Sequence, residues 1–167
     1  MNFKVDNLVL LFDSSNGYIP IAFRAFSTFS INNAPKKTRI LYVEGTAVDP
    51  KYQGHGIYQE ITRRLIPDFD FIVSRTQSPV VATALSRIFS EVYPLTSEPT
   101  NNIKLIAKFI ADYLEMPSYD YDKMTGRRTY QGILTEKMPK IENEMKKIVI
   151  KKIKPEEGDC LILVCPI

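Results

Sequence analysis

The feature that most constrains this chain is a segment in which an apolar strand-like run passes through two glycines into an amphipathic helix. Residues 39–48 have the composition of a strand covered on both faces, and Asp49-Pro50 ends it. After Gly54-His55-Gly56, apolar residues recur every four positions, which predicts a helix over residues 56–66. The chain has only 7 glycines and 1 histidine. The clustering of three glycines and that histidine within residues 45–56 therefore needs an explanation.

Two glycines at the start of a helix indicate an anion site. A turn of this kind can direct successive backbone N–H groups into one concavity at the positive end of the helix dipole, where a phosphate binds without any lysine. Glycines allow the backbone to approach the ligand closely. A tight turn with no ligand is the alternative. The spacing is neither the dinucleotide fingerprint nor a P-loop, because the third glycine and the Gly-Lys-Ser/Thr sequence are missing.

Composition predicts one globular domain over residues 1–167. The chain is 44% hydrophobic and 25% charged, with a net charge of +3, so a nucleic-acid partner is unsupported apart from a lysine-rich run over residues 137–154. One His and two Cys are too few for a metal site, and Cys160 and Cys165 are expected to be small hydrophobic residues on opposite faces of a strand. No signal peptide or membrane span is recognised, so we expect a cytoplasmic protein without membrane contact.

The first half of the chain predicts a β-rich arrangement. Apolar runs over residues 3–12 and 18–29, separated by Asp13-Ser14-Ser15-Asn16-Gly17, predict a hairpin. Residues 69–74 predict a buried strand parallel to residues 39–48, because the intervening helix provides the crossover.

The second half predicts helices, a loop and a closing hairpin. Ser78-Pro79 predicts the start of a helix that continues to about Tyr93, and a second helix is expected over residues 101–115. Residues 116–132 are polar and tyrosine-rich, which predicts a long loop. A short helix over residues 134–147 and a hairpin formed by residues 148–153 and 159–167 complete the prediction.

The segment from Ala47 to Ile57 resembles the pyrophosphate-binding motif of the GNAT superfamily of acetyl-CoA-dependent N-acetyltransferases. That motif reads Gln/Arg-x-x-Gly-x-Gly/Ala; Gln53 and Gly56 match its first two positions, and Tyr58 stands at the third. The order strand, loop, helix, strand, helix also agrees with the family over about residues 39–93. The resemblance implies an α/β (α+β) fold with a mixed, mostly antiparallel central sheet, a parallel strand pair at the coenzyme site and flanking helices.

The resemblance also implies a coenzyme site. The pantetheine of acetyl-CoA would lie beside the strand that ends at Val48, and Ser78 would contact the coenzyme arm. The residues of the loop and of the first helical turn would bind the pyrophosphate, namely Gln53, Gly54, His55, Gly56, Ile57 and Tyr58. His55, as the variable residue of the motif, is expected to face solvent.

The family mechanism is direct attack of a primary amine on the thioester. Glu44 is the candidate base because it shares strand parity with Val48, and a structural carboxylate paired with Arg24 or Lys51 is the alternative. The family's tyrosine acid is missing, since Leu85 or Ser86 stands at its position. Tyr93 is the replacement, or else a packed aromatic residue.

Three departures favour a second interpretation, a non-catalytic GNAT-fold module that binds acyl-CoA: the missing tyrosine acid, Tyr58 in the motif and the reduced N-terminal part. The first two strands lack the helices that usually separate them, and residues 95–139 have the character of an insertion. That insertion would supply the acceptor pocket or a subunit contact, such as that of a homodimer, or would be a solvated loop. Its candidate contact residues are Tyr119, Tyr121, Arg127, Arg128 and Tyr130. The identity of the amine acceptor is left open.

Overall fold

A computed structural model describes residues 6–33, 36–134 and 144–167 of the chain. The chain divides into two compact units, the first extending to Ile72 and including Ile167, and the second comprising Val73–Pro166. Both units combine strands with helices, and most strand pairs are antiparallel. The predicted fold class, a mixed α/β fold, is confirmed. That residues 1–167 form a single domain stays a prediction.

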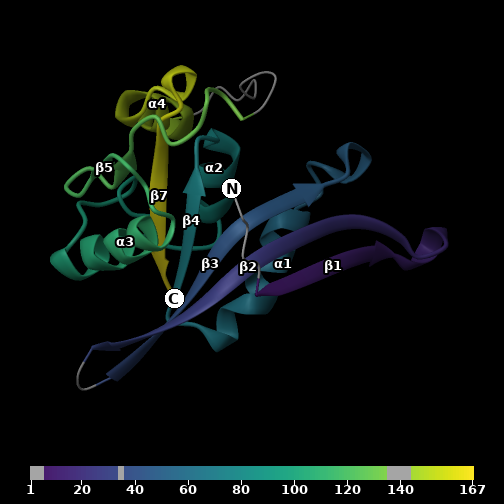
Figure 1. The fold of residues 1–167 in the computed structure, drawn as a ribbon. Helices are drawn as coiled ribbons and strands as arrows, with labels where there is room; N and C mark the ends of the chain where they lie inside the picture. Colours follow the sequence, from purple (N-terminus) through teal and green to yellow (C-terminus); the bar gives the residue numbers. More distant parts are fainter. Residues whose placement is uncertain (1–5, 34–35, 135–143) are drawn as a thin grey trace. The chain divides into compact units, whose positions relative to one another are not determined.

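The first unit contains three consecutive antiparallel strands, β1 (Asn7–Asp13), β2 (Ile19–Asn33) and β3 (Lys36–Val48), which run side by side in Figure 1. The predicted hairpin is confirmed over the described residues. Its turn is stabilised by Asp13, whose carboxylate accepts hydrogen bonds from the backbone N–H and the hydroxyl of Ser15.

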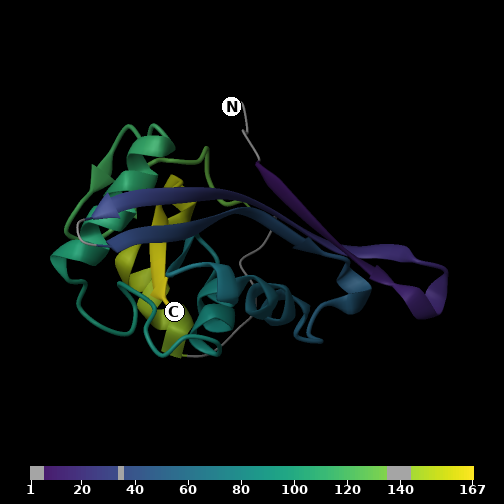
Figure 2. The ribbon, with the colours of Figure 1, turned by 90° about the horizontal axis from the view of Figure 1, so that it is seen from below.

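The helix α1 (Ile57–Leu65) connects β3 to β4 (Phe71–Thr76). Just before β4, the N–H of Asp70 donates to the carbonyl of Arg39 near the start of β3, so β4 enters the sheet parallel to β3. α1 packs on one face of the first unit's strands (Figure 2) and buries Ile61 and Thr62. This is the predicted crossover, and burial of Ile61 accounts for the helical spacing of apolar residues.

Residues 73–76 of β4 belong to the second unit. There β7 (Cys160–Pro166) lies between this part of β4 and two short strands, β6 (Thr125–Gly126) and β5 (Tyr119–Asp120). Residues 160–165 are fully buried, which makes β7 the centre of the core. α3 (Asn101–Tyr113) packs on β7 through a face that includes Ile103, Ile106 and Ile110. Both cysteines are buried and free, as predicted.

The helix predicted from Ser78 to about Tyr93 ends earlier than expected. α2 covers only Pro79–Ser86, with the Ser78 hydroxyl accepting from the Val80 N–H as the predicted N-cap. Tyr93 instead exchanges two backbone hydrogen bonds with Val164 of β7. Tertiary pairing has therefore replaced the last turns of the helix, because the sheet satisfies the backbone groups that the helix would have used.

Residues 148–152 are helical, which corrects the predicted closing hairpin. α4 (Glu144–Lys152) packs against α2. Val149 and Ile153, four residues apart, are buried, whereas Ile150 is exposed. β-branched composition suggested a strand, but the apolar side chains that are buried follow the helical period.

The segment at residues 116–132 is also corrected, because it contains β5 and β6 and buries Thr125. The predicted helix over residues 134–147 falls mostly on residues 135–143, outside the described residues. Within the described ranges, every helix is too short or too polar to cross a membrane.

Candidate functional site

Hydrogen bonds hold the first part of the glycine loop, which comprises residues 49–56. The Asp49 carboxylate accepts from the Lys51 N–H at 2.8 Å and starts a short 3-10 turn over Pro50–Tyr52. The Tyr52 hydroxyl donates to Asp13 Oδ2 at 2.7 Å, which ties this turn to the β1–β2 hairpin. The loop therefore leaves the end of β3 in a defined direction, as the sequence Asp-Pro predicts.

The loop then enters α1 through two left-handed glycines. Gly54 has φ +83° and Gly56 has φ +78°, values that favour glycine. Gly56 is the N-cap residue, and no side chain caps α1. A Cβ atom on Gly54 would meet no atom within 4 Å, and one on Gly56 would meet only the Gln59 side chain at 4.0 Å. The first N–H groups of α1 thus have no side-chain cap, and the space beside the two glycines is open, an arrangement that favours an anion.

Arg24 lies between β3 and α1, and sequence reasoning named it only as a pairing partner for Glu44. Its side chain is fully buried. Nε donates to the Thr46 hydroxyl at 3.0 Å, Nη1 to the Thr62 hydroxyl at 2.7 Å, and Nη2 to the Tyr58 carbonyl at 3.4 Å. The signal was present, since Arg24 is the single charge in the apolar run Ile21-Ala22-Phe23-Arg24-Ala25-Phe26.

The charge of Arg24 is not balanced by a carboxylate of the described residues. Its guanidinium instead stacks over the Tyr58 ring, 4.4 Å from the ring centroid. Burial lowers the pKa of Arg24 from its ordinary value, while the interaction with Tyr58 opposes that change. A buried cation therefore lies against the first turns of α1.

The other motif residues make contacts within the loop. Gln53 Nε2 donates to the Val48 carbonyl at 3.0 Å, and His55 Nδ1 lies 3.0 Å from the Gln53 carbonyl. His55 is exposed. The amide of Gln53 thus joins the end of β3 to the glycine loop. That Val48, Gln53, His55, Ile57 and Tyr58 bind a coenzyme stays a prediction.

Glu44 lies at a β-bulge in β3. Ala25 of β2 pairs with Gly45 and Phe26 pairs with Val43, so Glu44 is the extra residue between them. Its carboxylate accepts from the Ser27 hydroxyl at 3.0 Å.

This bulge corrects the parity argument for Glu44. Ser27 and Arg24 are three residues apart on β2 and point to opposite faces, so Glu44 and Thr46 also lie on opposite faces. Glu44 and Val48 therefore do not share a face, because the bulge interrupts the alternation. The alternative pairing with Arg24 is excluded by the same geometry, whereas the catalytic role of Glu44 stays a prediction.

A groove of about 310 Å³ lies within the first unit where β3 ends. It runs beside the start of the glycine loop and is mostly apolar. Its lining comes from three strands and the following turn: Leu10, Pro20, Ile21, Ala22, Phe23, Ala47, Val48, Asp49 and Pro50.

Two predicted site residues, Ser78 and Tyr93, belong to the second unit. The Ser78 hydroxyl is engaged as the N-cap of α2. Tyr93 is 7% exposed, and a hydrogen bond to the Glu91 carboxylate, together with burial, raises the pKa of its hydroxyl. Tyr93 is therefore a weaker acid than an ordinary tyrosine. The assignment of Ser78 to coenzyme binding and of Tyr93 to acid catalysis stays a prediction.

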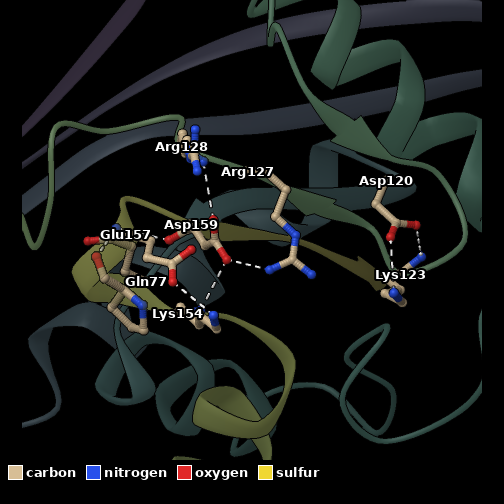
Figure 3. A network of polar contacts seen from close by, with 9 residues as sticks. Gln77, Asp120, Lys123, Arg127, Arg128, Lys154, Glu157 and Asp159 are labelled. Carbon is tan, nitrogen blue, oxygen red and sulfur yellow. Dashed lines mark hydrogen bonds and ion pairs between the residues drawn. The ribbon is translucent and has the colours of Figure 1, made fainter.

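The second unit holds a polar network that the sequence reasoning did not identify (Figure 3). Gln77, 4% exposed, donates through Nε2 to the carbonyls of Gly132, Pro155 and Asp159, and its Oε1 accepts from the Leu134 N–H. One side chain thus ties together three segments. A glutamine directly before a helix N-cap carries no sequence signal for this role.

Asp159 is the charged centre of the same network. Its side chain is 1% exposed, forms an ion pair with Arg127 Nη1, and accepts from the backbone N–H groups of Arg128 and Lys154 at 3.2 Å each. Burial raises the pKa of Asp159, but these hydrogen bonds outweigh it and hold the pKa below the ordinary value. Over the described ranges, no group of three or more His, Cys, Asp or Glu side chains could hold a metal ion.

Comparison with known proteins gives little sequence similarity. No protein-family model matches the chain, and no curated protein matches it. Among solved structures, the fold is similar to a chain in the crystal structure of the NatC complex bound to Gag peptide and CoA, with a TM-score of 0.38 and 16% identity over 96% of this chain and 70% of that chain.

Proposed function

We propose that this protein is an acetyl-CoA-dependent acyltransferase that transfers an acetyl group to a primary amine. The observation that supports it is the glycine loop, in which Gly54 and Gly56 precede the uncapped start of α1, while the buried cation of Arg24 contacts the first turns of that helix. The same segment carries the sequence resemblance to the N-acetyltransferase pyrophosphate motif. Pyrophosphate is a suitable ligand because helix N-termini and unbalanced cations both favour anions.

In this proposal the glycine loop and the end of β3 hold two parts of the coenzyme. Backbone N–H groups from Gly54 to Tyr58 would bind the pyrophosphate, and the open space over both glycines leaves room for it. The strand that ends at Val48 would position the pantetheine. When bound, acetyl-CoA supplies the activated thioester carbonyl.

The protein then has to move two protons while the amine nitrogen bonds to the carbonyl carbon and the carbon–sulfur bond breaks. In this proposal Glu44 accepts the proton that the ammonium loses, and the Ser27 hydroxyl orients its carboxylate. The nitrogen loses a second proton as the amide forms, which balances the proton that the leaving thiolate gains, and we propose Tyr93 as the donor to that thiolate.

Calorimetric titration with acetyl-CoA tests the binding step. Gly56→Val adds a β-branched side chain at φ +78° and places it over the first N–H groups of α1, so we expect affinity to fall by about tenfold or more. Gly132→Ala is the matched control, because Gly132 also has a positive φ with no atom within 4 Å of an added Cβ. Absence of heat with the wild type, or equal affinities for the two variants, would contradict the proposal.

A second candidate function is a non-catalytic module that binds acyl-CoA. The raised pKa of Tyr93, caused by its hydrogen bond to Glu91 and by burial, favours it, because such a hydroxyl donates its proton less readily. Release of coenzyme thiol in the presence of a panel of primary amines separates the two functions. Binding without thiol release for any amine identifies the module.

A further inference from the structure

The second unit contains a cavity that the proposed function does not use. Its volume is about 590 Å³, within the range of small-molecule sites. Three cations and two carboxylates line it together with one hydroxyl: Ser118, Arg127, Arg128, Lys154, Glu157 and Asp159. The formal charge of the lining is therefore +1.

Two of the three cations that line this cavity form ion pairs with its two carboxylates, and the third cation, Arg128, does not. Asp159 pairs with Arg127, and Glu157 pairs with Lys154 at 2.8 Å. Arg128 is exposed, and its guanidinium makes no ion pair or hydrogen bond with any side chain of the described residues. Arg127 uses one nitrogen for Asp159 and remains 37% exposed, so its other N–H groups are accessible.

The backbone at Arg128 is held in an unusual conformation. Arg128 has φ +48°, a left-handed conformation that is costly for a residue with a side chain, and the hydrogen bond from its N–H to Asp159 Oδ1 holds it there. Gly158 has φ +83° on the opposite side of the network, and a Cβ there would lie 1.9 Å from the Tyr130 carbonyl. The Tyr130 N–H donates to Gly158, which joins the two segments.

Buried side chains hold the segments that line this cavity in place. Gln77 holds the carbonyls of Pro155 and Asp159, and Asp159 in turn fixes the backbone of Arg128 and Lys154 (Figure 3). The cations therefore project from an ordered framework, which lowers the entropic cost of binding a ligand.

We propose that this cavity binds a small anionic ligand through the guanidinium groups of Arg127 and Arg128. Two guanidinium groups in the lining of one cavity suit an oxyanion, either a carboxylate or a phosphate, because a guanidinium fork can donate two parallel hydrogen bonds to it. The internal pairs keep Arg127 and Lys154 in place, and the unbalanced charge of Arg128 selects for an anion. The site belongs entirely to the second unit and does not depend on coenzyme binding at the glycine loop.

Backbone amide shifts of the isotope-labelled full chain, titrated with sodium pyrophosphate and separately with sodium citrate at constant ionic strength, test this site. We expect saturable shifts at Arg127, Arg128 and Asp159, and the probe that binds more tightly identifies the oxyanion as phosphate or carboxylate. Shifts at Gly54 and Gly56 report separately on the glycine loop, so the failure of one site does not hide the other.

Arg128→Gly is the decisive variant, because glycine tolerates φ +48° and retains the N–H that donates to Asp159. We expect the affinity at this site to weaken about tenfold. Lys147→Ala is the matched control, since it removes an equal charge from a side chain that is 72% exposed and lies outside the cavity. Absence of saturable shifts at Arg127 and Arg128 with both probes, or equal weakening in the two variants, would overturn the proposal.

Discussion

Arg24 stands in a strand whose neighbouring residues are apolar, and its burial without a carboxylate of the described residues has an energetic cost. Its three hydrogen bonds offset part of that cost and also define what the residue does. Two of them reach Thr62 and Tyr58 of α1, so the guanidinium fixes the first turns of the helix against the sheet. At the residue scale, Arg24 is thus a positioning residue for the glycine loop.

Arg24→Met should weaken acetyl-CoA binding by about tenfold, because the variant removes both the cation and the contacts that orient α1. The free energy of unfolding should change by less than about 2 kcal/mol, since no described carboxylate loses a partner and the apolar side chain fills a similar volume. Calorimetry and chemical denaturation measure the two effects. Arg63→Met, which removes a charge from an exposed residue of the same helix, is the control. Equal binding by the two variants would refute the role of Arg24.

The two cysteines allow a second residue-scale prediction. Cys160 and Cys165 are fully buried, and burial raises the pKa of both thiols. Because the thiolate is the reactive form, the native protein should react with a thiol reagent at pH 8 far more slowly than the unfolded chain, by about a hundredfold or more. Absorbance of the released chromophore measures both rates. Fast reaction of either cysteine in the native state would contradict the buried position of β7.

At the scale of elements, hydrogen bonds to Asp159 and pairing with β7 together order a polar segment. Asp159 precedes β7, and its carboxylate accepts hydrogen bonds from residues on both sides of the cavity. The composition of residues 116–132 is that of a solvated loop, but β6 of this segment pairs with β7 and buries Thr125. Pairing with a buried strand therefore decides the conformation of a polar segment.

Stability should depend on pH through Asp159. Its pKa in the folded state lies below its ordinary value of 3.8, so its contribution is present above about pH 3.8 and is lost as the pH falls through the folded-state pKa. Asp159→Asn should lower the free energy of unfolding at pH 7 by about 1–3 kcal/mol, because it breaks the ion pair with Arg127. The variant should also lose less stability than the wild type below pH 3.8. Denaturation at a series of pH values tests both statements, and parallel pH profiles would rule out a depressed pKa.

At the scale of the whole molecule, the chain passes between its two compact units inside a strand. The division falls between Ile72 and Val73 of β4, and the final residue, Ile167, belongs again to the first unit, where its N–H donates to the Asp70 carbonyl at 3.1 Å. The chain thus crosses from one unit to the other twice, without a separate linker at β4.

We therefore expect one cooperative unfolding transition rather than two. Far-ultraviolet circular dichroism and tyrosine fluorescence, followed in the same denaturant series, should give the same midpoint. The chain has 9 tyrosines and no tryptophan, so tyrosine is the available fluorophore. Two separated midpoints would mean that the units unfold independently and that residues 1–167 are not one domain.

Sequence alone determined the elements whose signals are local. The hairpin turn at Asp13, the helix that follows Gly56 and the N-cap at Ser78 all follow from turn chemistry, apolar spacing and capping within a few residues. Only the tertiary structure decided the end of α2, the helical state of residues 148–152, the bulge at Glu44 and the burial of Arg24. Each of these depends on a partner distant in the chain, because long-range pairing and burial outweigh local preferences of about 1 kcal/mol or less per residue.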